Sequence, residues 1–329
     1  MSQAWKTQHF EMELVTVTCD RDFQQTILQA HSLDKFLVDP CVHWIVVERS
    51  NKPITYWKDK LQPHYTRHSL KIIHSSSIIQ CDNLPGYFRQ QIIKLKIAEL
   101  IGSESYLILD SKDLLIRPVN LHAWGDSEGN SSIYYPPANS TTLEDILGPD
   151  LKWNKVFLEA VEKYNQLTRP SFFWAPITPF RVKTNTVKKL NSSLDLEYYF
   201  NPLSNSFSKQ ASEFLLYRYF SNISLEIPDT TTGTWAPENN AKFLWSGKTL
   251  DANLEVLRDE FYKSVSFHRW YIVNNGSRIH QILDVLINEI GLDSKLVQSA
   301  FDVNYWNIHT WAERGHPIFE EFDFGFRKN

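Results

Sequence analysis

Residues 106–118 read YLILDSKDLLIRP, and this stretch decides the expected fold. Four apolar residues lead directly into Asp110, and a second apolar run begins after Asp113. A short, continuously apolar run is typical of a strand that is buried on both faces, as in a parallel sheet. In open α/β sheets, ligands bind at the carboxyl edge of such strands. We therefore expect Asp110 to hold a cation or a sugar hydroxyl at this edge, with a loop-capping role as the alternative.

Strands and helices alternate before this stretch. Strands are expected at residues 12–19, 43–48 and 70–73, and helices at 22–37 and 87–101. The alternation predicts an α/β fold with a mostly parallel sheet and crossover helices.

The second half of the chain differs in composition from the first. Residues 119–150 are rich in Asn, Ser, Gly and Pro, which is typical of long loops. Two prolines in residues 172–182 predict an edge or irregular strand, because proline removes a ladder donor. Further elements are expected as strands at 132–135, 242–247 and 264–270, and as helices at 150–167, 184–194, 210–220, 251–262, 278–290 and 294–312. We expect a single domain over residues 1–329, with a soft division near 120–150.

Composition excludes several classes of protein. A net charge of −4 with no basic run argues against nucleic-acid binding. No apolar run reaches the length of about 18 residues that a transmembrane helix needs. The N-terminal residues lack the apolar run of a secretory signal, and three cysteines without metal-type spacing are typical of a reducing compartment. A cytoplasmic protein is expected, and its 11 Trp indicate either a ligand cleft or large cores and interfaces.

Two carboxylates follow the decisive strand. Asp110 and Asp113 could hold Mg²⁺ or Mn²⁺ through oxygen ligands, with the cation bridging a diphosphate. Lys112 lies between them and could itself neutralise phosphate charge. The alternative is a purely structural role for both acids.

Polar residues also end the first two expected strands. Thr18, Asp20 and Glu48 could hydrogen-bond a base and a ribose at the same sheet edge. Asp20 to Asp22 could instead cap the following helix. The chain contains neither a G-x-G-x-x-G nor a Walker A motif, which argues against dinucleotide and P-loop enzymes.

Other candidates lie on helices and on a late strand. Gln91 and Lys94 are three residues apart, so they are neighbours on one side of a helix. Glu213 stands in an apolar, aromatic helix, where a carboxylate could serve as general base or could face solvent. His268 is a possible metal ligand or phosphate donor, although a lone histidine is more often structural.

These pieces form an ordered series along the chain. Thr-Cys-Asp comes first, followed by Gln-x-x-Lys, Tyr-x-x-Leu-Asp-Ser-x-Asp, Thr-Pro, Ser-Glu-x-x-x-Tyr and Ser-x-His-Arg. From about residue 10 to 270, the series resembles the GT-A-type glycosyltransferase-like proteins of bacterial and phage polysaccharide loci. The resemblance implies a GT-A-like, Rossmann-related α/β fold. In it, residues 1–120 bind a nucleotide sugar, and the irregular half of residues 121–329 binds the acceptor and adds C-terminal helices.

The resemblance also assigns roles to residues. Asp110 matches the first acid of the Asp-x-Asp motif, which binds the metal and the sugar nucleotide. The second acid would fall on Lys112, and Asp113 comes one residue late. Three arrangements are open. Asp110 and His268 hold the cation, or Asp113 turns toward the cation as the second carboxylate ligand, or the charge of Lys112 replaces that of the metal. The remaining residues match positions that contact substrates in the family. Thr18, Asp20 and Glu48 match the strand ends that contact the nucleoside, and Gln91 and Lys94 match the helix that faces the donor. Glu213 matches the carboxylate near the acceptor, and His268 matches the late histidine that contacts the metal or the diphosphate.

The function implied is sugar transfer from a nucleotide-sugar donor to a glycan or other hydroxyl acceptor, with Mn²⁺ or Mg²⁺ as the expected cofactor. Glu213 would be the general base, and a metal or Lys112 would stabilise the departing diphosphate. One alternative is a non-catalytic carbohydrate-binding or scaffold protein on a degenerate glycosyltransferase fold, which Lys112 favours. Another is a nucleotidyltransferase, but the chain has no Gly-rich basic loop near the first strand.

Overall fold

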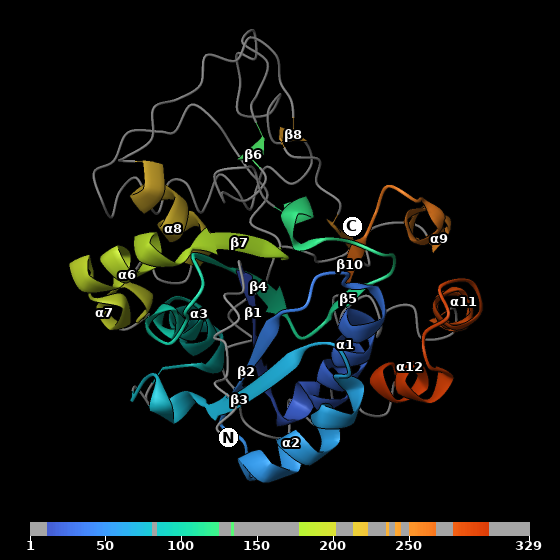
Figure 1. Ribbon diagram of the computed structural model, residues 1–329, viewed down its shortest axis with the longest axis horizontal. Helices are drawn as coiled ribbons and strands as arrows, with labels where there is room; N and C mark the ends of the chain where they lie inside the picture. The colour runs from blue at the N-terminus through green and yellow to red at the C-terminus, as the bar shows by residue number, and fades with distance from the viewer. Residues whose placement is uncertain are drawn as a thin grey trace, which may run out of the picture.

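A computed structural model gives the structure of the chain (Figure 1). It describes residues 12–80, 84–124, 133–134, 178–201, 213–222, 235–236, 241–244, 250–267 and 279–302. His268, Cys81 and the helix expected at 150–167 lie outside the described residues.

A five-stranded sheet forms the centre of the described structure. Its order is β3-β2-β1-β4-β7. The first four strands are parallel and β7 is antiparallel to β4. The strands are β1 (Met12–Cys19), β2 (Val42–Glu48), β3 (Ser69–His74), β4 (Ser105–Asp110) and β7 (Phe180–Lys183). The predicted α/β fold with a mostly parallel sheet is confirmed, and β7 lies at the edge that its prolines predicted.

Alternate side chains of the central strands enter apolar clusters on opposite faces of the sheet. Val15 and Ile108 pack in a cluster on one face, whereas Leu14 and Leu107 pack in a cluster on the other face. Apolar residues of the helices belong to one side or the other of this division, and Figure 1 shows the two groups of helices on opposite sides of the sheet. The first group is α3 (Gly86–Lys96), α6 (Thr184–Ser193), α7 (Leu196–Phe200) and α8 (Glu213–Asn222). The second is α1 (Phe23–Phe36), α2 (Ile54–Leu61), α9 (Leu250–Arg258), α11 (Ile279–Asp284), a π-helical segment (Val285–Glu289) and α12 (Ser294–Ala300).

A second sheet begins where β4 ends. It consists of β5 (Asp113–Leu115), β10 (Ser264–Phe267) and β9 (Ala241–Leu244). Strand β10 is antiparallel to β5 and parallel to β9. Because β4 ends at Asp110 and β5 starts at Asp113, the turn between the two acids crosses from one sheet to the other. A small antiparallel pair, β6 (Ile133–Tyr134) with β8 (Trp235–Ala236), completes the described strands.

Two details differ from the sequence-based expectation. The expected capping of α1 is wrong: Asp22 is at the N-cap position without a side-chain cap bond, because residues 20–22 form a 3₁₀ turn. Helices α2 and α7 were not expected. Within the described part of the chain, no helix has the length and apolar character needed to cross a membrane.

Candidate functional site

The predicted polar residues converge at one edge of the central sheet. In the parallel register, Val17 lies opposite Asp110 and Cys19 lies opposite Glu48. Strands β1, β2 and β4 therefore end at the same carboxyl edge, which is where an open α/β sheet binds its ligands.

The centre of this site is the ammonium group of Lys94. Its Nζ lies 2.9 Å from Oδ1 of Asp110 and 2.9 Å from Oε1 of Glu213. Lys112 approaches the other oxygen of Asp110, with 3.6 Å between Nζ and Oδ2. The side chains of Lys94 and Glu213 are buried, whereas that of Asp110 is 28% exposed. We call these four residues the Lys94 cluster.

Opposite charges hold the two central groups in their charged forms. Burial alone would lower the pKa of Lys94, but Asp110 and Glu213 outweigh burial and raise it above the ordinary lysine value. Burial alone would raise the pKa of Asp110, but Lys94 and then Lys112 outweigh burial and hold it well below its usual range. Lys94 and Asp110 are therefore both ionised at neutral pH, because each charge favours the charged form of the other.

Helices α3 and α8 bring Glu213 to this position. The first backbone N–H of α8, that of Glu213, donates to Oε1 of Gln91 at 3.1 Å. The next residue, Phe214, stacks on Phe180 of β7 with ring centroids 4.4 Å apart. Glu213 is 5% exposed, so the alternative in which it faces solvent is wrong. The spacing of Gln91 and Lys94 does place both on the side of α3 that meets α8.

A glutamine of α1 forms hydrogen bonds to both ends of the turn that connects the two sheets. The amide nitrogen of Gln29 donates to the carbonyl oxygens of Asp110 at 2.6 Å and Asp113 at 3.1 Å. Its own oxygen accepts from Thr16 at 2.9 Å, and Thr16 also contacts the ring of His43. Sequence reasoning missed Gln29, because it is 81 residues from Asp110 and no local motif connects them.

Asp113 occupies a more enclosed position than Asp110. It is 3% exposed, and its Oδ2 accepts the backbone N–H of Asp110 at 2.7 Å. Burial, and then the charge of Asp110, raise the pKa of Asp113 to about 7. The nearby hydroxyls of Thr178 and Ser266 oppose this shift, although neither reaches its second oxygen with ordinary hydrogen-bond geometry.

We expect Asp113→Asn to flatten the pH dependence of stability. Between about pH 4 and pH 7 the unfolded chain releases this proton while the folded chain keeps it, so the free energy of unfolding falls as the pH rises. The stabilisation from protonated Asp113 is fully present below the pKa of this residue in the unfolded chain. It is lost as the pH rises through the pKa of Asp113 in the folded chain, and the loss is roughly 4 kcal/mol at most. Urea unfolding at several pH values measures this slope. Exposed Asp59→Asn is the control, and equal slopes in wild type and Asp113→Asn would contradict the expectation.

The predicted nucleoside-binding residues have protein partners in this structure. The Thr18 hydroxyl pairs with that of Thr26 at 2.7 Å, and Asp20 accepts from Ser50 and from the backbone of Asn51. Their role in binding a nucleoside stays a prediction.

Glu48 forms a buried ion pair that sequence reasoning did not foresee. Its Oε1 lies 2.9 Å from Nε of Arg89, and both side chains are almost fully buried. Burial raises the pKa of Glu48, and Arg89 and then Arg49 oppose that shift. The pair joins the end of β2 to α3, and nucleoside binding by Glu48 likewise stays a prediction.

Residues 18–231 match the model of DUF6492, which is described as a family of unknown function. The chain belongs to DUF6492. The matched region contains the whole Lys94 cluster, and His268 lies beyond it. A search of curated proteins finds no match.

The similar solved structures include a bifunctional glycosyltransferase and a mutant of LgtC. The bifunctional glycosyltransferase WbbM has a TM-score of 0.43 and 11% identity over 92% of this chain. This chain spans about half of that protein, 51% of its length. An active-site mutant of LgtC has a TM-score of 0.43 and 9% identity over 78% of this chain and 87% of its own. At these scores and identities, the likeness says nothing about the activity of this DUF6492 chain.

The described residues do not by themselves fit a divalent cation. Both oxygens of Asp110 face ammonium groups, and one oxygen of Asp113 accepts a backbone N–H. Among the residues that the structure covers, no group of three His, Cys, Asp or Glu is arranged to hold a metal ion. Mg²⁺ requires near-octahedral oxygen ligands, which this arrangement does not offer. A site made by Asp110, Asp113 and His268 stays a prediction, since His268 lies outside the described residues.

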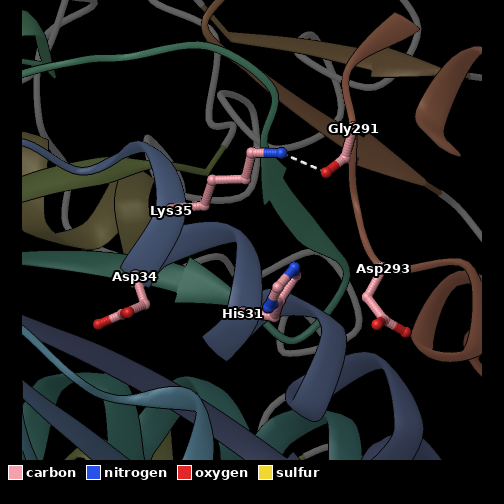
Figure 2. A pocket seen from close by; sticks show the side chains of 5 residues that line it. All are labelled: His31, Asp34, Lys35, Gly291 and Asp293. Carbon is pink, nitrogen blue, oxygen red and sulfur yellow. Dashed lines mark hydrogen bonds between the residues drawn. The ribbon is translucent and has the colours of Figure 1, made fainter. Parts of the chain in front are cut away.

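A pocket between α1 and the residues just before α12 does not contain the cluster. It has a volume of about 310 Å³ and is lined by His31, Asp34, Lys35, Gly291 and Asp293 (Figure 2). Lys35 donates to the carbonyls of Ile290, at 3.3 Å, and Gly291, and so ties α1 to the end of the π-helical segment. Gly291 has φ +76°, and a Cβ there would meet Nζ of Lys35 at 2.9 Å. Lys35 and Gly291 of this pocket therefore have a structural role, which is to hold α1 against the end of the π-helical segment.

Proposed function

We propose that this chain is a glycosyltransferase that moves a sugar from a nucleotide-sugar donor to a hydroxyl acceptor. The observation that carries the proposal is the Lys94 cluster. Lys94 brings the candidate donor-side acid, Asp110, and the candidate base, Glu213, onto one ammonium group at the carboxyl edge of a parallel sheet. An inverting sugar transfer needs a base beside the acceptor hydroxyl and positive charge beside the departing diphosphate, and Glu213 and Lys112 of this cluster are the candidates for these two roles.

The proposed reaction assigns one step to each group. The acceptor oxygen attacks the anomeric carbon, and Glu213 takes the acceptor's proton. The bond from the anomeric carbon to the diphosphate oxygen breaks, and the diphosphate leaves with the bonding electron pair. Lys112, at the partly exposed side of Asp110, offsets the negative charge that develops on the diphosphate.

In this proposal, the two halves of the chain have the roles that the resemblance implies. Residues 1–120 supply the donor side, and residues 121–329 supply the acceptor side. Glu213 of α8 is the described residue of the second half that reaches the cluster.

A thermal-shift screen of UDP-, GDP-, ADP- and CMP-sugars, each with Mn²⁺, Mg²⁺ or EDTA, tests the proposal. We expect one nucleotide class to raise the melting temperature, because a ligand at a hundredfold excess over its Kd stabilises the folded state by about 2.7 kcal/mol. A shift that persists in EDTA supports Lys112 as the charge carrier, and a shift that requires metal supports the predicted cation site. No shift with any donor would overturn the transferase proposal and favour a non-catalytic protein on the same fold.

Glu213→Gln separates binding from chemistry in the same assay. The amide still accepts from Lys94 but takes no proton, so we expect the donor-induced shift to remain while donor hydrolysis and transfer fall by roughly 100-fold or more. Exposed Glu197→Gln is the matched control. Full turnover by Glu213→Gln would remove Glu213 from the role of base.

A further inference from the structure

A row of hydrogen-bonded side chains leads through β2, β1 and α1 to the turn that connects the two sheets. Its members are Tyr65, His43, Thr16 and Gln29, and we call it the Tyr65–Gln29 row. The Tyr65 hydroxyl lies 2.6 Å from Nδ1 of His43, and Nε2 of His43 lies 2.9 Å from Oγ1 of Thr16. Thr16, His43 and Gln29 are fully buried, and Tyr65 is 6% exposed. Each polar group therefore depends on its neighbours in the row for its hydrogen bonds.

The turn fixes the orientation of the Gln29 amide. This side chain faces the carbonyl oxygens of Asp110 at 2.6 Å and Asp113 at 3.1 Å. A carbonyl oxygen only accepts, so the amide group that faces the turn must be the NH₂ group. The amide oxygen then faces Thr16 at 2.9 Å, and Thr16 must donate to it the one hydrogen that its hydroxyl has. Only the lone pairs of the Thr16 hydroxyl are left for His43.

This donation decides which ring nitrogen of His43 carries the hydrogen. Thr16 can only accept from His43, so Nε2 of His43 must be the donor. Burial lowers the pKa of His43 to about 3, so the ring is neutral at pH 7 and has a single N–H. Nδ1 is then the acceptor, and the Tyr65 hydroxyl donates to it. All bonds of the row are therefore donated in one direction, from Tyr65 toward the turn.

Resting on the proposed transferase function, we propose that His43 and Thr16 are positioning residues for sugar transfer. His43, as a neutral ring with its hydrogen on Nε2, keeps the Thr16 hydroxyl directed at Gln29. Gln29 in turn holds both ends of the turn that carries Lys112, the proposed partner of the departing diphosphate. A group that acts on developing charge needs supporting hydrogen bonds of this kind to stay in place.

The position of the hydrogen on His43 is tested without any substrate. Long-range ¹H–¹⁵N NMR at pH 7 on protein with ¹⁵N-labelled histidine distinguishes a protonated from an unprotonated ring nitrogen. The signals absent from His43→Phe identify His43; if that variant does not fold, the Nδ1 signal that moves in Tyr65→Phe identifies it. We expect the hydrogen on Nε2 in the wild type and also in Tyr65→Phe, because the Gln29 end of the row sets the direction. A hydrogen on Nδ1 in either protein would overturn the proposal.

Kinetics distinguish a positioning role from a structural one. Thr16→Val leaves the Gln29 oxygen without its donor, so we expect kcat for transfer, per folded protein, to fall by roughly tenfold. Thr16→Ser keeps the hydroxyl and is expected to restore kcat to within about threefold of wild type. The donor KM is expected to change less than kcat, because the charge on the diphosphate develops in the transition state.

A second buried threonine provides the matched control. The Thr184 hydroxyl donates to the carbonyl of Ser103 at 2.8 Å, outside the row, so Thr184→Val loses a comparable bond and is expected to keep the kcat of wild type. An equal kcat in Thr16→Val and Thr184→Val would overturn the positioning role.

The outcomes separate this proposal from the transferase proposal. Transfer by the wild type with no specific effect of Thr16→Val overturns the positioning role alone. If the wild type transfers no sugar, the transferase function fails, and hydrogen–deuterium exchange of residues 110–113 then tests the hold on the turn. Faster exchange in Thr16→Val than in Thr184→Val and Thr16→Ser supports that hold, and equal exchange overturns it.

Discussion

Lys94→Met is expected to destabilise the protein by about 3–5 kcal/mol and to abolish transfer. Lys94 holds two carboxylates through contacts of 2.9 Å each, and methionine keeps the length of the side chain without its charge. Removing one partner of a buried ion pair leaves an uncompensated charge, which is far more costly than the pair itself is stabilising. Here the repulsion between Asp110 and Glu213 adds to that cost. Urea unfolding at pH 7 measures the loss of stability.

Two further variants show whether the charge is responsible. Lys96→Met, on the same helix two residues away, is the control for the substitution itself and is expected to stay close to wild type. Adding Glu213→Gln to Lys94→Met removes one of the stranded carboxylates, so the double variant is expected to regain part of the stability. If the double variant is as unstable as the sum of the single effects, the carboxylates are not coupled through Lys94.

The elements of the sheet were readable from sequence because their signals are local. The β-branched run of β1 and the apolar run of β4 each predict a buried strand on their own, and the structure buries both. Helix α2 was missed because only Trp57 and Leu61 of its eight residues are buried, which is too narrow a stripe to recognise. Helix α7 has five residues and is identified mainly by its cap, Asp195, which accepts the N–H of Tyr198.

Neighbours within one helix could be predicted from the sequence, but pairings between distant elements could not. Spacing on α3 predicted that Gln91 and Lys94 share a side, because helix geometry fixes that relation over three residues. The direction of Glu213 depends on how α8 packs against α3, and 119 residues separate Glu213 from Lys94. The partner of Glu48 is an arginine 41 residues away, which no motif marks. Pairings of this kind arise only when the helices dock on the sheet.

Gln29→Leu is expected to loosen the turn between Asp110 and Asp113 and to lower transfer by roughly 100-fold, because small displacements of positioned groups have effects of this size. Gln29 is fully buried and donates to the carbonyls at both ends of the turn. Leucine fills similar space but leaves both oxygens without this donor, at a cost of about 1–3 kcal/mol for each. Steady-state kinetics with the donor that binds in the screen measure the change.

Gln29→Glu tests hydrogen bonding at constant shape. A charged carboxylate has no proton to donate, so it would face the two carbonyl oxygens with negative charge, and we expect a loss at least as large as that of leucine. Gln25→Leu is the matched control, since Gln25 is buried one turn earlier on α1 and makes none of the described hydrogen bonds to residues 110–113. A purely structural role for Gln29 would lower stability and leave kcat of the folded fraction unchanged. A fall in kcat that exceeds the unfolded fraction would instead show that the position of this turn sets the geometry of the Lys94 cluster.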